Sequence, residues 1–295
     1  MVQPWAVCAG LALGAAAAAD TVDVPADRDN TIYQNSLGAF SNGAGPQIFA
    51  GKNAVGQIRR ALIRFDVAAA VPFGSTITDV KLTLNLSQTV SFDEPVSLYR
   101  LLTDWGEGTS NAGDPGGSGA LATPGDATWL HTFFDTRFWA APGGAPGTDM
   151  AILASATIAV GNPLGPYTWN STPALLADVQ SWVDAPAGNF GWIIVGDETA
   201  PGTAKRFDSR ENATPGNRPN LRITYTPPPP GSCYANCDGT TRPPCLNVLD
   251  FICFLNRFAA GDTYANCDQS TSPPVLNVLD FGCFLNRFGA GCSAC

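Results

Sequence analysis

The C-terminal part of the chain contains almost the same sequence twice, and this repeat limits the fold more than any other feature. Three segments, 234–238 (YANCD), 246–251 (LNVLDF) and 253–258 (CFLNRF), recur thirty residues later at 264–268, 276–281 and 283–288. Each copy is too short to bury a core alone, so we expect the two copies to pack against each other. Each copy also places Asn and Asp just before an amphipathic helical pattern, as a loop that binds metal through oxygen atoms does.

The composition of the chain favours short strands and turns, because it includes 31 glycines and 24 prolines among 295 residues. The net charge is −9, and the lysines and arginines are scattered along the sequence. This charge pattern argues against a nucleic-acid partner and against binding to an anionic membrane surface. It also disfavours polyanionic glycans as ligands, unless calcium bridges them.

The N-terminal residues 1–19 form an apolar run that ends in small residues, which is typical of a secretory signal peptide. The alternative is a buried N-terminal segment. No other stretch approaches the ~20 consecutive apolar residues that a membrane-spanning helix needs. We therefore predict a secreted or cell-surface protein without a membrane span.

The cysteines are concentrated at the C-terminus, where eight of the nine lie between Cys233 and Cys295. In an exported chain this density indicates a disulfide framework. A zinc site is the alternative, but no pair of C-x-x-C motifs has zinc-finger spacing and the only histidine is the distant His131.

The segment 227–232 is rich in proline and predicts a linker between two domains. The preceding domain, residues 20–226, contains alternating or apolar runs that predict strands, and residues 172–182 predict one helix with Thr172 as its N-cap. Many short strands, long loops and one covering helix favour a jelly-roll-like β-sandwich of two sheets. The strand-like runs are 57–65, 80–86, 95–101, 190–195 and 220–225.

Several motifs in residues 21–226 resemble those of secreted bacterial proteins with a DNRLRE domain. The resemblance is carried by the segments 60–66, 104–107, 126–129, 205–211 and 218–225. It implies a β-sandwich related to carbohydrate-binding modules, without catalytic residues of its own. The repeat, residues 233–295, resembles the cysteine-bearing dockerin of planctomycete-like bacteria, which implies a small helical, disulfide-rich, EF-hand-like module that docks onto a cohesin-like or other surface protein.

The dockerin resemblance also implies calcium as a cofactor. The residues that match ligand positions are Asn236, Asp238, Asn247 and Asp250 in the first copy, and Asn266, Asp268, Asn277 and Asp280 in the second. Tyr234 and Tyr264 stand where the first ligand would be an aspartate, and each loop is longer than in a dockerin. Both departures predict weak calcium binding, and a loop without metal is the alternative.

Two disulfides follow from the helical spacing of the repeat. Cys253 lies three residues after Asp250, so both side chains share a helix face and Cys253 faces the loop that contains Cys237. We therefore predict the bonds Cys237–Cys253 and Cys267–Cys283, each contributing ~3 kcal/mol in the chain-entropy model. The pairing of the other four cysteines of this region stays open. The mutual core of the two helices is predicted to contain Val248, Phe251, Leu255 and Phe258 with Val278, Phe281, Leu285 and Phe288.

Catalytic and binding residues are less clearly marked. The best acidic candidates are Asp104, Glu107, Asp208 and Glu211, but basic residues accompany the last two, and no catalytic triad is recognisable around His131. Trp129 and Trp139 belong to a cluster of aromatic residues that predicts either a glycan-binding platform or part of the core. Asp23, Asp27, Asp29 and Asn30 predict either a structural calcium site or a solvated turn.

Together these observations favour a non-catalytic protein in which a β-sandwich of glycan-binding type is attached to a protein partner through a dockerin-like module. The first alternative is a purely structural surface or matrix protein that binds no sugar. The second is a polysaccharide lyase or hydrolase. The sequence does not identify the polysaccharide.

Overall fold

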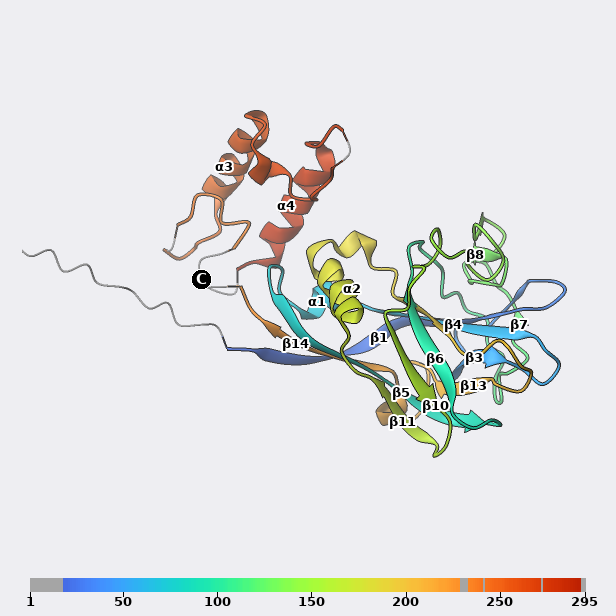
Figure 1. The fold of residues 1–295 in the computed structure, drawn as a ribbon. Coiled ribbons are helices and arrows are strands. Elements are labelled where there is room, and N and C mark those ends of the chain that lie inside the picture. The colour runs from blue at the N-terminus through green and yellow to red at the C-terminus, as the bar shows by residue number, and fades with distance from the viewer. Residues whose placement is uncertain (1–17, 229–232, 241, 272, 293–295) are drawn as a thin grey trace, which may run out of the picture.

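The structure, a computed structural model, describes residues 18–228, 233–240, 242–271 and 273–292. It consists of a mainly β domain followed by a small helical module (Figure 1). Both classes of structure were expected from the sequence and are confirmed. Most of the predicted signal peptide and part of the predicted linker lie outside the described residues.

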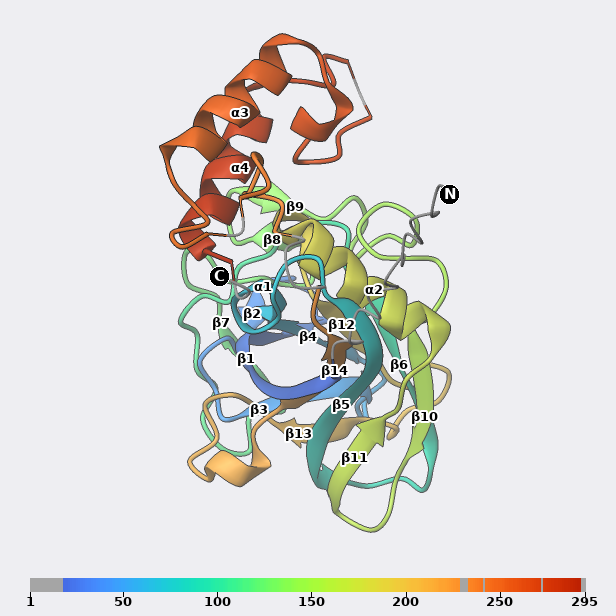
Figure 2. The ribbon, with the colours of Figure 1, turned by 90° about the vertical axis from the view of Figure 1, so that its left-hand side faces the viewer.

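Six antiparallel strands of the β domain close into a ring. Their order is β1 (Asp20–Tyr33), β14 (Asn220–Thr226), β5 (Thr76–Thr89), β13 (Lys205–Asp208), β3 (Gln47–Lys52) and β4 (Ile58–Phe65), which returns to β1. The ring closes because β1 is long: Asp20–Pro25 pair with β14, and Ala26–Tyr33 pair with β4 after a bulge. The sequence predicts two facing sheets, whereas the structure joins them through this shared strand (Figure 2).

Further strands pair with strands of this ring or form separate two-stranded sheets. Strands β12 (Trp192–Val195), β6 (Glu94–Arg100) and β10 (Ala156–Val160) continue outward from β4, and β11 (Gly165–Trp169) pairs with β5. Two small two-stranded sheets are formed by β2 (Phe40–Ser41) with β7 (Ala120–Leu121) and by the hairpin of β8 (His131–Phe133) with β9 (Arg137–Phe138). The helical elements of this domain are α1 (Val67–Ala70), α2 (Pro173–Asp184), η1 (Pro186–Gly188) and η2 (Pro215–Asn217).

The main core lies inside the ring and under α2. In β5 the alternating residues Val80, Leu82, Leu84 and Leu86 are all buried, as their period of two predicts. Helix α2 begins after Thr172, whose side chain accepts a hydrogen bond from the Leu175 N–H. Its buried face includes Trp182, which packs edge-to-face on Trp192 with ring centroids 4.5 Å apart. Each fully buried side chain of this size contributes about 1.5–3 kcal/mol.

The C-terminal module is built from α3 (Val248–Ala259), η3 (Thr263–Ala265) and α4 (Val278–Ala290). Phe254 and Phe284 form its centre, with stacked rings 4.2 Å apart. Three disulfides surround this pair: Cys233–Cys292, Cys237–Cys253 and Cys267–Cys283. The last two are the pairs expected from the repeat, and Cys245 is disulfide-bonded as well.

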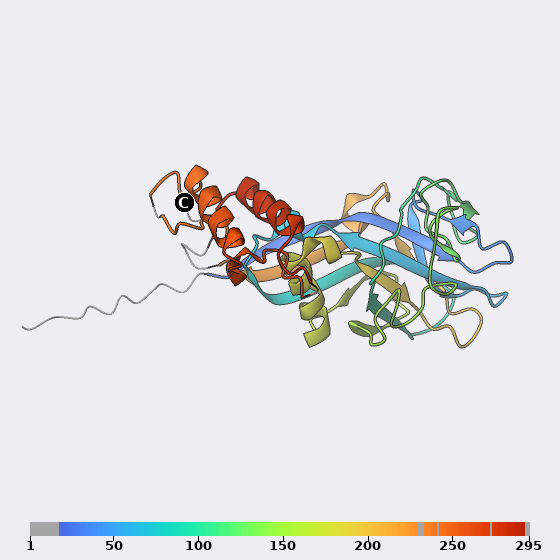
Figure 3. The same ribbon diagram turned by 90° about the horizontal axis from the view of Figure 1, so that it is seen from above.

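The module lies at the end of the β domain where α1 and the start of β5 meet (Figures 1 and 3). The turn between α1 and β5 carries Phe73, whose ring packs edge-to-face on Tyr234 at 6.4 Å. In the described part of the chain, none of the helices has the length and apolar character required to cross a membrane.

Candidate functional sites

The predicted calcium ligands form a hydrogen-bonded cap at the start of each helix. Asp250 is buried; one carboxylate oxygen accepts the Asn247 N–H at 2.9 Å, and the other accepts the Asp238 N–H at 3.2 Å. The Asn247 side chain in turn accepts the Leu249 N–H at 2.8 Å, and Asn247 and Asp250 form a reciprocal capping box. The second copy repeats these contacts with Asp280, Asn277 and Asp268. The structure therefore brings three of the four predicted residues of each copy into one network.

The fourth residue, Asn236 or Asn266, leaves a buried oxygen without a partner. The Asn236 amide donates to the Thr240 carbonyl at 2.6 Å, and the Asn266 amide donates to the Ser270 carbonyl at 3.0 Å. The Oδ1 atoms of both asparagines are buried and accept no hydrogen bond. An unsatisfied buried acceptor of this kind costs about 1–3 kcal/mol unless a cation or a water satisfies it.

These loops fit a weak calcium site better than a tight one. Each contributes two carboxylates, and both oxygens of the buried carboxylate already accept N–H bonds. Residues 18–228, 233–240, 242–271 and 273–292 contain no cluster of three or more His, Cys, Asp or Glu side chains that could hold a metal ion. The orphaned asparagine oxygen is the one feature of each loop that favours a bound cation.

Tyr234 and Tyr264 stand where the dockerin resemblance places the first calcium ligand. Their side chains connect the two repeats. Their rings stack at 4.7 Å with an interplanar angle of 10°. The Tyr234 hydroxyl donates to the Tyr264 carbonyl at 2.5 Å, and the Tyr264 hydroxyl donates to the Tyr234 carbonyl. Burial raises the pKa of both phenols, that of Tyr264 to about 12. The sequence signal for this role is that both copies make the same replacement.

The tryptophans predicted as a glycan platform belong to the core, which corrects that expectation. Trp129 and Trp139 are 7% and 5% exposed and pack with Trp105, Leu101 and Ile193 beneath the long loops. The Trp139 indole N–H donates to the Thr128 carbonyl at 2.9 Å, and the Arg60 guanidinium lies over the Trp129 ring. Neither ring offers a free face to a sugar. The exposed member of the aromatic cluster is Phe138, which lies against the His131 ring at 4.3 Å.

The candidate catalytic groups have structural partners. His131 is buried and its Nδ1 lies 3.0 Å from the Thr128 hydroxyl, and burial lowers the pKa of this histidine. Asp104 accepts a hydrogen bond from Arg28 at 3.1 Å, and Asp208 accepts one from the Asn85 amide at 2.6 Å. Glu211 forms an ion pair with Arg210 at 2.5 Å.

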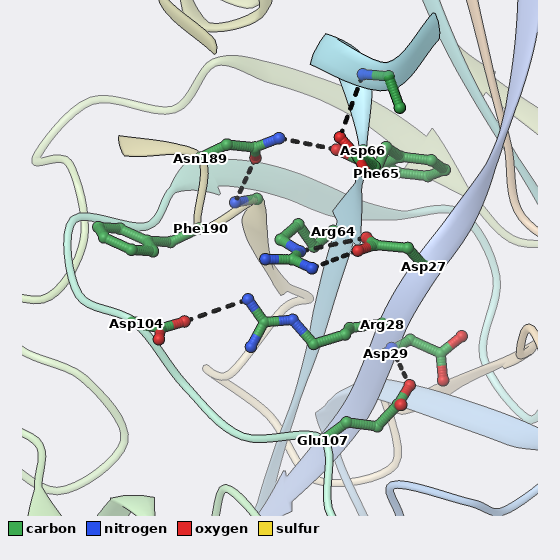
Figure 4. Close-up of polar contacts among 12 residues, drawn as sticks. Asp27, Arg28, Asp29, Arg64, Phe65, Asp66, Asp104, Glu107, Asn189 and Phe190 are labelled. Atoms are coloured by element: carbon green, nitrogen blue, oxygen red, sulfur yellow. Dashed lines mark hydrogen bonds and ion pairs between the residues drawn. The ribbon is translucent and has the colours of Figure 1, made fainter. Parts of the chain in front are cut away.

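The acidic residues along β1 do not converge on one calcium site. Asp23 pairs with Arg222 and Asp27 pairs with Arg64, while the Asn30 Oδ1 accepts hydrogen bonds from Thr31, Ser41 and Asn42. Figure 4 shows Asp27 turned to Arg64 and Asp29 separated from that pair. The expectation of a joint calcium site in this stretch is therefore wrong.

Asp29 is the unusual member of this stretch because it is a buried acid among other acids. One of its oxygens accepts the Arg210 N–H at 2.7 Å, and the other has no partner. The Asp29 N–H donates to the Glu107 side chain at 2.8 Å (Figure 4). Burial, together with the charges of Glu211 and Glu107, raises the pKa of Asp29 well above its usual range. Burial also raises the pKa of Glu107.

A groove of about 300 Å³ in the β domain brings three basic side chains together. Its walls include Phe49 and Val90, and its cations are Lys52, Arg59 and Arg206. Arg206 pairs with the exposed Asp114 at 3.2 Å. Arg59 donates to the Gly117 and Ile58 carbonyls, and Lys52 to the Glu198 carbonyl. Within the described residues, neither Lys52 nor Arg59 has a carboxylate at salt-bridge distance.

One wall of this groove is held by a buried lysine. The Lys205 ammonium donates to Thr89 at 2.9 Å, to the Ser91 hydroxyl at 2.7 Å and to the Phe92 carbonyl at 2.8 Å. Burial lowers the pKa of Lys205. These bonds fix the turn that carries Val90. The groove had no sequence signal because its residues come from separate strands, among them β3, β4, β5 and β13.

The helices of the module expose a large amount of apolar surface. Phe251, Phe254 and Phe258 face the module core, while a second stripe on α3 faces solvent, so the predicted core positions Val248 and Leu255 are wrong. The same correction applies to Val278 and Leu285 on α4. Eight large apolar side chains here are 39–78% exposed: Val248, Leu249, Ile252, Leu255, Val275, Val278, Leu279 and Leu285.

Comparison with known proteins gives no assignment: no model of a protein family matches the chain, and no curated protein shows significant similarity to it.

Proposed function

We propose that this chain is a non-catalytic, extracellular binding protein whose β domain holds an acidic glycan in the basic groove and whose C-terminal module docks onto a surface protein. In this proposal the β domain is a jelly-roll-like domain of the DNRLRE type. The C-terminal module is dockerin-like, and its loops bind calcium weakly. The purely structural and the enzymatic alternatives are outcomes of the tests below.

The docking role rests on the exposed apolar stripes of α3 and α4. The module already has a complete core of phenylalanine rings and is held by disulfides, so it does not need these eight side chains for its own folding. Contiguous exposed apolar surface on a small module is typical of a protein-protein interaction site. This is the observation that carries the proposed attachment to a partner.

The glycan-binding role rests on the charge and shape of the groove. Among the described residues neither Lys52 nor Arg59 has a carboxylate at salt-bridge distance, although the Asp197 carboxylate is close enough to interact with Lys52. Arg59 is buried beside the Tyr33 ring, and this burial lowers the pKa of its guanidinium. A uronate or sulfate group would supply a negative charge to Lys52, and the exposed Val90 side chain offers an apolar wall for a sugar ring. The local charge of the groove thus differs from the net charge of −9, which disfavours polyanions at long range.

The glycan role is tested by retention of the secreted chain on a panel of acidic and neutral polysaccharides, with reducing ends measured in parallel. We expect retention on acidic polymers that weakens with salt, and no release of reducing ends or unsaturated products. Retention on none of the polymers favours the structural alternative. Product release favours the enzymatic one.

The docking role is tested by crosslinking to surface proteins of the producing cells. The variant Leu249→Asp/Leu279→Asp places charges on both stripes near the helix N-termini, where acids are tolerated. We expect it to lose a crosslinked band that the wild type forms. The matched control is Leu153→Asp, which alters an exposed leucine of the β domain. Equal bands from all three proteins would contradict docking through the stripes.

A further inference from the structure

Arg257 and Arg287 occupy equivalent positions in the two repeats, and each lies over a tyrosine ring of the other repeat. Arg257 of α3 lies over the ring of Tyr264, which belongs to the second repeat, at 4.7 Å. Arg287 of α4 lies over the ring of Tyr234, which belongs to the first repeat, at 4.5 Å. Each arginine thus covers one face of the Tyr234–Tyr264 stack. The near-twofold relation of the repeats predicts the same surroundings for both guanidinium groups.

The β domain breaks this symmetry at Arg287. The ring of Phe73 lies 3.4 Å from the Arg287 guanidinium, so the cation has an aromatic neighbour in the other domain as well as in its own. Arg287 also donates to the Cys267 carbonyl at 2.9 Å. Burial is the main cause that lowers the pKa of Arg287, and the nearby Tyr234, Asp184 at the end of α2, and Tyr264 oppose this effect. This arginine is therefore seated between the module and the β domain.

Among the described residues, Arg257 has an aromatic neighbour in the module but none in the β domain. Its side chain is 43% exposed and pairs with Asp262 at 3.1 Å, and Tyr264 is the one ring that lies over it in the described part of the chain. The helix beneath it also differs: Ile252 of α3 is exposed, whereas the equivalent position of α4 is Gly282. The first repeat therefore combines an open guanidinium with a continuous apolar stripe.

We propose that the Arg257 face of α3 is a seat for a phenylalanine or tyrosine ring carried on a turn of the partner protein, equivalent to the seat at Arg287 that Phe73 fills. This inference rests on the proposed docking function. It adds the type of residue with which the partner makes contact and the number of partners that one module binds. A guanidinium over an aromatic face is a favourable contact. Asp262 already balances the charge of Arg257, so the partner turn needs no acid of its own. One module takes one partner, because the β domain occupies the second seat.

The first test uses the full chain and a probe copied from the filled seat. The probe is a cyclic peptide with the sequence of residues 71–76, which contains Phe73, added to millimolar concentration. NMR of the arginine Nε–Hε signals reports a ring that stacks on a guanidinium. We expect a saturable shift of the Arg257 signal and no shift of the Arg287 signal in the wild type. In Phe73→Ala, both signals should shift.

The controls separate stacking from charge. Arg257→Lys keeps the positive charge beside Asp262 but loses the planar group, and it identifies the Arg257 signal. A peptide with alanine in place of phenylalanine should shift neither signal. An Arg257 signal that does not move at saturating probe in the wild type, or that moves equally with the alanine peptide, would overturn the proposal. Phe73→Leu is a second variant for the Arg287 seat if Phe73→Ala is poorly folded.

The second test distinguishes failure of this seat from failure of docking. Arg257→Lys is compared with wild type and with Leu249→Asp/Leu279→Asp in the crosslinking experiment. We expect Arg257→Lys to reduce the crosslinked band at least tenfold, while Arg222→Lys, which alters an arginine paired with Asp23 in the β domain, leaves it unchanged. A band lost in the leucine variant but fully kept in Arg257→Lys would leave docking standing and refute the arginine seat.

Discussion

Tyr234 and Tyr264 explain at the level of single residues why the repeat departs from a calcium-loop pattern. A tyrosine at the first ligand position removes a carboxylate but supplies a ring that stacks across the repeats and a hydroxyl that bonds the opposite backbone. These contacts hold the two small repeats together. The sequence showed the replacement but not its purpose, because the contact joins residues thirty positions apart.

The contacts between the two tyrosines predict a symmetric loss of stability. Tyr234→Phe and Tyr264→Phe keep the ring stack and remove one hydroxyl-to-carbonyl bond each. We expect each variant to lower the free energy of unfolding of the oxidised module by about 0.5–1.5 kcal/mol. Urea unfolding followed by near-UV circular dichroism measures the change. Unchanged midpoints in both variants would show that these contacts do not stabilise the module.

Asp29 predicts a pH dependence of stability with a definite sign. Because its folded pKa is raised, the folded state binds the proton more tightly than the unfolded state does. Its contribution is therefore most favourable below the ordinary aspartate pKa and is lost as the pH rises through the folded pKa. Asp29→Asn keeps an acceptor for the Arg210 N–H and removes the charge, so it should stabilise the β domain at pH 7 more than at pH 4.

Asp23 is the matched control for this measurement. Hydrogen bonds from Arg222 and Asn220 lower the pKa of Asp23, so its contribution is present above the unfolded pKa and is lost as the pH falls. Asp23→Asn should therefore slightly destabilise the protein at pH 7 and have no effect at low pH. Thermal unfolding from pH 7 down to well below the ordinary aspartate pKa compares the two variants, and the same pH trend in both would contradict the account.

The loops of the repeat predict weak calcium binding that depends on the helix-start acid. A carboxylate can offer two oxygens to Ca²⁺ and an asparagine side chain one, so Asp250→Ala should weaken binding more than Asn236→Ala. Calorimetry on the oxidised full chain at millimolar Ca²⁺ measures both. Because Asp250 also caps α3, its fold is checked by the helical circular dichroism signal without calcium. The absence of any binding heat in the wild type would favour the loop without metal.

At the level of elements, the sequence correctly predicted the strand and the helix that have a clear periodicity or cap. It missed the features that arise only from contacts between distant segments. The alternation of residues 80–86 placed β5 correctly, and Thr172 and Pro173 placed the start of α2. The aromatic residues near Trp129 have no period, because their burial depends on loops that fold over the second core cluster. The groove was missed because its residues come from separate strands and meet only in the folded domain.

The buried position of the loop tryptophans predicts a stability effect rather than a binding effect. Trp129→Ala or Trp139→Ala should lower the free energy of unfolding by about 3–5 kcal/mol, as large-to-small changes in a core do. Phe138→Ala, which alters an exposed ring of the same region, should change it by less than about 0.5 kcal/mol. Denaturant unfolding checks both. A stable Trp139→Ala variant that fails only in glycan retention would restore the platform hypothesis.

At the level of the whole molecule, the two parts depend on different stabilising principles. The β domain has a large core and, within residues 20–226, no cysteine, whereas the module has a small core and several disulfides. Small domains of this kind depend on their crosslinks. Phe73 of the β domain and Arg287 of the module are in contact and join the two parts.

This division predicts two separate responses to a reducing agent. Reduction should unfold the module, with loss of the α3 and α4 signals, since removal of native disulfides from a small domain costs about 2–5 kcal/mol each. The β domain should keep its thermal midpoint within a few degrees. Hydrogen exchange with and without reductant resolves the two parts. Simultaneous loss of protection in both would show that the β domain depends on the module.

The basic groove is the central element of the proposed function, and calorimetry with a uronic-acid oligosaccharide tests it most directly. The wild type is compared with Lys52→Gln/Arg206→Gln, which removes two groove cations, and with Arg222→Gln, which removes a cation of β14 outside the groove. We expect the groove variant to lose at least tenfold in affinity while Arg222→Gln keeps the wild-type affinity. Equal affinity in all three proteins, or no binding by the wild type to any acidic oligosaccharide, would contradict the account.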